Sequence, residues 1–183
     1  VDQEGLAVTR TGEEPVLAVT VSETETGKVV RTVEDHRTLA DEPMVLPEGK
    51  YTVLAYAGDN IQAGFDSPYY EGTTEVTVEA GAEAQAELTA AIANVKVTVS
   101  RSETVTQSFT SFSVTVSNGQ AHGSLEYAGE TLSSEGYFPC TGTLSWVLSI
   151  TSSDGRSYTL SDDIQDLHPK KHYNIHFDVD GEV

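Results

Sequence analysis

Four polar side chains near the end of the chain have the spacing of a metal site. They lie two residues apart, so in a strand adjacent members would sit roughly 7 Å apart on one face. They are His172, Asn174, His176 and Asp178. Neighbours at that spacing could share a divalent cation. We favour a solvated face at a sheet edge, because no cysteine or further histidine completes a recognisable ligand set.

Two acidic groups could in principle hydrolyse glycosides, since paired carboxylates do this chemistry when they flank a cleft. They are expected in loops, and comprise Glu34, Asp35, His36, Asp41 and Glu42, then Asp162, Asp163 and Asp166. Exposed loops rarely hold a carboxyl in the apolar environment that catalysis needs. We therefore interpret both groups as solvated charge and predict no enzyme activity, no metal and no cofactor.

An aromatic cluster is the best candidate for binding. Phe65, Tyr69 and Tyr70 surround Asp66 and Pro68 in a loop-like stretch. Exposed rings of this kind stack on sugars or anchor a protein partner. The alternative is that they fold inward and close one end of a domain.

The remaining reactive side chains favour structural roles. Cys140 is the only cysteine and follows apolar residues, so packing is expected rather than nucleophilic chemistry. An isopeptide cross-link from Lys28, Lys50 or Lys96 to an asparagine is disfavoured. Lys96 alternates with two valines and should point to water.

Period-two alternation dominates the sequence, and this pattern predicts strands rather than helices. The expected strands are 16–23, 50–57, 74–79, 94–100, 109–117, 144–150 and 173–179. Asn118-Gly119 and Asp154-Gly155 are the strongest hairpin signals. The Ala- and Glu-rich run 80–93 is interpreted as a turn, a strand and a crossover into the second half.

Acid density falls and alternation restarts at residue 94. We therefore predict an all-β fold of two tandem β-sandwich domains, 1–93 and 94–183. The 29 acidic against 10 basic side chains give a formal net charge of −19, which excludes nucleic acid and anionic lipid surfaces as partners. No apolar run is long enough to cross a bilayer. The chain starts at Val1 without Met, so we expect a leader to have been removed.

Three segments carry a family resemblance. LPEGKYTVLAYAGDN at 46–60 looks like the turn and strand of transthyretin-like sandwiches. AGFDSPYYEGTTEVTVEAG at 63–81, followed by LTAAIANVKVTV at 88–99, resembles Bacteroidetes surface lipoproteins of the domain of unknown function 4493 family, which are fimbrillin-like. LHPKKHYNIHFDV at 167–179 resembles a fimbrillin closing strand.

The resemblance implies export and anchorage at the outer-membrane cell surface through an N-terminal lipid on a cysteine that would precede Val1. It assigns no catalytic residue. Together with the residues above, it predicts an adhesion or surface-accessory protein whose partner is a protein or glycan at the cell surface. The alternative is a glycan-binding module, with Phe65, Tyr69 and Tyr70 as the binding residues in either case.

Overall fold

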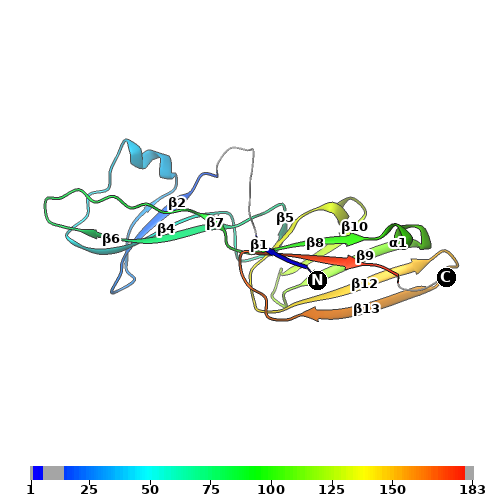
Figure 1. The fold of residues 1–183 in the computed structure, drawn as a ribbon. Coiled ribbons are helices and arrows are strands. Elements are labelled where there is room, and N and C mark those ends of the chain that lie inside the picture. Colours follow the sequence, from blue (N-terminus) through cyan, green and yellow to red (C-terminus); the bar gives the residue numbers. More distant parts are fainter. Residues whose placement is uncertain (1, 6–14, 180–183) are drawn as a thin grey trace. The chain divides into compact units, whose positions relative to one another are not determined.

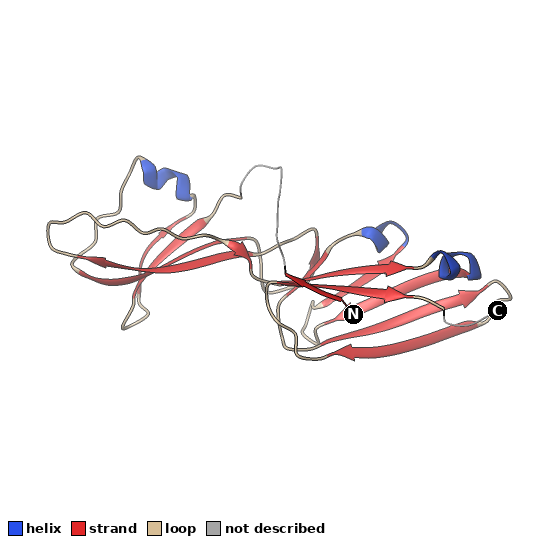
Figure 2. Cartoon of the chain, in the orientation of Figure 1, coloured by secondary structure: helices blue, strands red, loops and turns tan. Residues whose placement is uncertain are grey.

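The computed structural model describes residues 2–5 and 15–179, and the regular secondary structure there is almost entirely β (Figures 1 and 2). Contacts divide the chain into two units. The sandwich unit comprises the described residues 2–5, 59–68 and 94–179, and the single-sheet unit comprises 15–58 and 69–93. The predicted all-β class is confirmed.

The sandwich unit contains two sheets. One has the order β1-β14-β8-β11-β5, and the other has the order β10-β9-β12-β13. The strands of the first sheet are β1 (Asp2–Gly5), β14 (Lys171–Phe177), β8 (Val95–Arg101), β11 (Gly136–Phe138) and β5 (Gly64–Phe65). Those of the second are β10 (Ser124–Ala128), β9 (Phe109–Ser117), β12 (Leu144–Ser152) and β13 (Ser157–Ile164).

Alternate side chains of both sheets meet in one core. Val97 of β8, Tyr173 of β14 and Val114 of β9 are completely buried in it. In β14, Tyr173 and Ile175 are buried, while the residues that alternate with them are more exposed. This is the period-two pattern that the sequence predicted for a strand with one apolar face.

Turns and a short helix connect these strands. The two predicted hairpins are present, β9 to β10 and β12 to β13, and each uses its glycine at positive φ: 78° at Gly119 and 85° at Gly155. Helix α1 (Glu103–Ser108) was missed by the sequence prediction. This helix is short, and Ser102 caps its N-terminus: the Ser102 hydroxyl accepts a hydrogen bond from Val105 N at 3.2 Å.

The single-sheet unit has five strands in the order β3-β2-β4-β6-β7. They are β2 (Ala18–Glu23), β3 (Val29–Val33), β4 (Gly49–Ala57), β6 (Tyr70–Val78) and β7 (Ala91–Ile92). Val21, Tyr51 and Val53 form the centre of its core. Partly buried leucines from outside the strands pack against that core, including Leu39 of the 3₁₀-helix η1 (His36–Ala40) and Leu88. In the sandwich unit, a second 3₁₀-helix, η2 (Gly129–Ser133), follows β10.

Two features of this unit differ from the sequence prediction. The described part of it contains one sheet where a sandwich was expected. The run 80–93 contributes a turn and the two-residue strand β7, and residues 83–90 form no regular structure. Alanine and glutamate fit a pleated, half-buried surface poorly, so this run covers the core with Leu88 instead of forming a long strand.

The grouping of the chain also differs from a single cut after residue 93. The second unit does begin at residue 94, but it also takes in residues 59–68 and 2–5. Two pairings account for this: β5 pairs with β11, and β1 pairs with β14. Such long-range pairing leaves no signal in local composition.

Candidate functional site

The predicted aromatic site is divided between the two units. Phe65 belongs to the sandwich unit, where its ring meets Tyr127 edge to face at 5.0 Å between centroids. It is partly buried against the core, as the inward-folding alternative expected. Tyr69 and Tyr70 belong to the single-sheet unit and are also partly buried.

The Tyr69 hydroxyl donates a hydrogen bond to Glu71 at 2.8 Å. Desolvation and this carboxylate raise the pKa of Tyr69 to about 12, so the hydroxyl stays protonated at neutral pH. Tyr70 lies in the sheet, where its backbone faces Ala57 of β4 and Ile92 of β7. Of the three residues in the predicted binding site, only Tyr69 and Tyr70 belong to the same unit.

The face that could have held a metal, and that we expected to be solvated, is a row of hydrogen bonds between β8 and β14, here called the polar ladder. Its members are Thr98, Ser100, His172, Asn174 and His176. Thr98 Oγ1 lies 2.8 Å from His172 Nε2, and Ser100 Oγ lies 2.9 Å from His176 Nδ1. Asn174 Oδ1 accepts from Thr98 at 3.1 Å and from Ser100 at 3.2 Å.

The pairing of β14 differs from the expected position of this strand. β14 pairs with β8 on one side and with β1 on the other, so it is not the edge strand that we predicted. Asp178 does not join the row and instead hydrogen-bonds the Ser102 side chain, which holds its carboxyl pKa below the usual range. The polar atoms of the row serve as cross-strand links. Across the described ranges, no three His, Cys, Asp or Glu side chains are grouped to hold a metal.

An ion pair extends the polar surface onto β11. Lys96 Nζ contacts Glu135, whose other carboxylate oxygen accepts a hydrogen bond from the Tyr137 hydroxyl at 2.8 Å. Partial burial opposes ionisation of Glu135, but the bonds from Lys96 and Tyr137 outweigh it and lower the pKa of this carboxyl. The side chain of Lys96 is only 17% exposed, so the expectation that it points to water is wrong.

The acidic groups have local structural roles or lie on a strand. Asp35 caps η1 and binds the Arg37 guanidinium, which lowers the pKa of this carboxyl to about 2. Asp162 and Asp163 belong to β13, not to a loop, and Asp166 follows that strand at a positive φ of 55°. Asp163 N donates to Asp162 Oδ1 at 2.8 Å.

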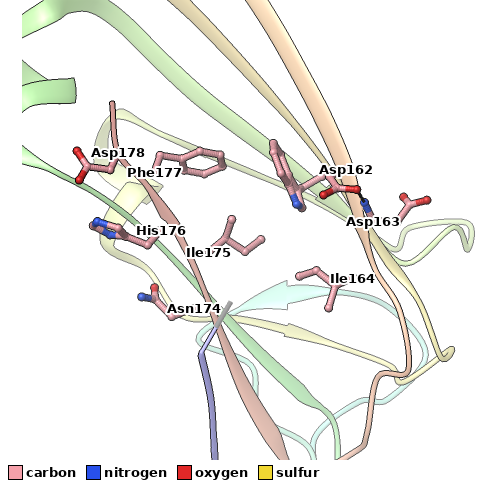
Figure 3. Close-up of a pocket in the computed structure, with 9 residues that line it drawn as sticks. Asp162, Asp163, Ile164, Asn174, Ile175, His176, Phe177 and Asp178 are labelled. Carbon is pink, nitrogen blue, oxygen red and sulfur yellow. Dashed lines mark hydrogen bonds between the residues drawn. The ribbon is translucent and has the colours of Figure 1, made fainter. Parts of the chain in front are cut away.

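A groove lies beside these two aspartates, at the border between β13 and β14 (Figure 3). Its volume is about 280 Å³, and Trp146, Ile164, Ile175 and Phe177 supply its apolar surface. Figure 3 shows Ile175 and Phe177 on the side of β14 that faces Asp162, while Asn174 and His176 point to the other side. The side chains of the polar ladder therefore point to the face of β14 opposite the apolar side chains of the groove, while Asn174 and His176 also belong to the groove's lining.

The alternation of Leu160, Asp162 and Ile164 is the sequence pattern that could have indicated this groove. Direct pairing with Leu148, Trp146 and Leu144 places Leu160, Asp162 and Ile164 of β13 on the core side. A charged residue at such a position indicates that the face is open there, because an unpaired buried carboxylate is costly.

Cys140 has the predicted packing role. It is partly buried against the sandwich core, and its thiol lies 3.5 Å from the carbonyl oxygen of Leu167. No helix in the described residues is long and apolar enough to cross a membrane.

Comparison with known proteins assigns the family. The model of the domain of unknown function DUF4493 matches residues 2–183. The chain belongs to this family. No curated protein matches this DUF4493 protein.

Two solved structures show weak likeness to the DUF4493 chain. One is a "putative adhesin" from Bacteroides ovatus, at 8% identity and a TM-score of 0.41, with 81% of this chain and 76% of that chain covered. The other is the major pilin protein T3.2 of Streptococcus pyogenes, at 12% identity and a TM-score of 0.23, with 91% and 90% covered. Similarity this low carries over neither fold details nor function.

Proposed function

We propose that this DUF4493 protein is a non-catalytic, fimbrillin-like cell-surface lipoprotein with an adhesion or surface-accessory role. Its lipid anchor would be attached to a cysteine preceding Val1, and its partner would be a protein or glycan at the cell surface. Membership of the DUF4493 family agrees with this proposal but does not by itself assign the role.

One contrast between side chains supports the proposal. The histidines and hydroxyls of the polar ladder hydrogen-bond one another across the sheet, and Glu135 is held by Lys96 and Tyr137. By contrast, Tyr158 and Leu160 of β13 are apolar and largely exposed. A surface with engaged polar groups and uncovered apolar ones is suited to binding rather than to proton transfer.

Deletion and complementation in the producing cell test this role. Loss of attachment to a partner cell or surface on deletion, restored by the lipidated protein, is the expected result. The same protein without the preceding anchor segment is the control for location. Unchanged attachment together with no labelling of intact cells by an antibody to the chain would contradict the proposal.

Glycan binding is the second candidate, and it is favoured by the partial exposure of Tyr69 and Tyr70. A glycan array of the purified chain should then give binding that Tyr69→Ala and Tyr70→Ala each weaken about tenfold, since stacked rings dominate sugar contacts. The control is Val45→Ala, which removes an exposed apolar side chain of the same unit outside the aromatic cluster. An array without signal, or binding indifferent to both tyrosines, rules this candidate out.

A further inference from the structure

The core-facing side of β13 is uncovered along much of its length. Leu160 pairs directly with Leu148, and Tyr158 pairs directly with Ile150, so each pair lies on one face of the sheet. Leu148 and Ile150 are 4% and 8% exposed, whereas Leu160 and Tyr158 are 55% and 46% exposed. The opposing sheet therefore covers β12 but leaves most of β13 open, since only its last residue, Ile164, is buried in the core.

The backbone of β13 is also free on one side. β13 is the last strand in its sheet, and within the described ranges only β12 pairs with it. An unpaired edge offers a row of alternating N–H and C=O groups to another strand. Natural edge strands are often protected by lysine, proline or inward-pointing charges; Ser157–Ile164 contains no lysine or proline, and its charged residues, Asp162 and Asp163, are confined to one end.

The groove lies at the Asp162 end of this open face of β13, and its aspartates make that end negatively charged. Trp146 packs edge to face on Phe177 at 5.1 Å between centroids and remains partly exposed. Asp162 pairs directly with Trp146, and Asp163 and Asp178 are also among the residues that line the groove. Among the described residues, no lysine or arginine lines this groove, so it complements a positively charged ligand with apolar groups.

We propose that the groove and the free edge of β13 bind an extended, basic peptide segment of a partner protein as an added strand. Its backbone would pair with β13, and alternate apolar side chains would cover Tyr158, Leu160 and Trp146. A lysine or arginine farther along the same face of the added strand would meet Asp162. A second copy of this chain is a poor occupant, because the formal net charge of −19 repels its like.

This inference specifies the partner for the proposed surface role and rests on that binding function. Fluorescence tests it directly, because Trp146 is the only tryptophan in the sequence and lines the groove. The intact chain is titrated with a synthetic peptide of about ten residues, a common strand length, in which Val or Ile alternates with Thr and the last two apolar positions are replaced by Lys, so that Lys lies on the same face as the apolar residues. The expected result is a saturable change in Trp146 emission, with affinity at least tenfold higher than for the same peptide carrying Glu in place of Lys.

Matched variants separate the groove from the rest of the sheet. Leu160→Ser should weaken binding about tenfold, the effect of removing one well-packed leucine contact. Val147→Ser is the control, because Val147 is 40% exposed and pairs with Ser161 and Thr115 on the opposite face. Asp162→Asn should reduce the dependence of affinity on salt concentration. Both Leu160 and Val147 are exposed, so neither substitution should alter the melting temperature by more than a few degrees.

The inference would be overturned by no emission change with the basic peptide, by equal binding of the acidic peptide, or by equal loss in Leu160→Ser and Val147→Ser. An emission shift without peptide that grows with chain concentration would overturn it in favour of self-association. A failure here with attachment intact in the deletion experiment removes the groove assignment alone. Loss of the surface role with peptide binding intact removes only the proposed function.

Discussion

At the scale of single residues, the described polar side chains mainly hold strands together. Lys96 and Glu135 link β8 to the segment before β11, and the Tyr137 hydroxyl adds a second bond to the same carboxylate. The side chain of Glu135 is 41% exposed, so solvent weakens this pair. Its contribution should nevertheless be visible as a dependence of stability on pH.

Because the folded-state pKa of Glu135 is lowered from 4.5, its stabilisation is fully present above that value. It is lost as the pH falls through the lower folded-state pKa. Thermal melts of Glu135→Gln and the parent chain from neutral to acid pH should therefore differ most at neutral pH and converge in acid. Lys28→Gln, which changes an exposed lysine in the connection between β2 and β3, is the control. A difference that is constant with pH would contradict an ionic role for Glu135.

At the scale of elements, alternation of side chains carried most of the prediction. The strand predicted at 109–117 coincides with β9, and that predicted at 144–150 lies within β12. Which strands are edges could not be predicted, because pairing partners far apart in sequence decide it. The sequence predicts β14 at a sheet edge, but β1 pairs with its outer side. The sequence predicts the acidic residues of β13 in a loop, but β13 is an edge strand of its sheet.

Helix α1 depends on one capping residue. Ser102 accepts a hydrogen bond from Val105 N, and its side chain also hydrogen-bonds Asp178. Ser102→Ala should therefore lower the free energy of unfolding by about 1 kcal/mol, measured by chemical denaturation. Ser102→Thr keeps a capping oxygen and should recover most of this loss. Equal destabilisation by both substitutions would show that the cap is not the cause.

At the scale of the whole molecule, two cores exist, one in each unit. The change in acid density at residue 94 was enough to predict a boundary there. It could not reveal that β1 and β5 belong to the sandwich unit, since each joins it through hydrogen bonds to a distant strand. The candidate aromatic site was divided for the same reason, with Phe65 used as packing for Tyr127.

A fragment of residues 94–183 should consequently be less stable than the same unit in the full chain. It lacks the strand pairing of β1 and β5 and loses the ring of Phe65 from its core. We expect a lower denaturation midpoint by Trp146 fluorescence, and Phe65→Ala in the full chain should reproduce part of it, about 1–3 kcal/mol. A fragment as stable as the intact unit would show that the added segments contribute nothing.

Photo-cross-linking on intact cells tests most directly whether the protein binds a partner through the open face of β13. A photoreactive benzoylphenylalanine replaces Leu160 in one strain and Val147, on the opposite face, in another. The account predicts an adduct at position 160 but not at 147, mapping to a basic, apolar segment of a different protein. Equal adducts at both positions, no adduct at either, or cross-linking only to a second copy of the chain would contradict it.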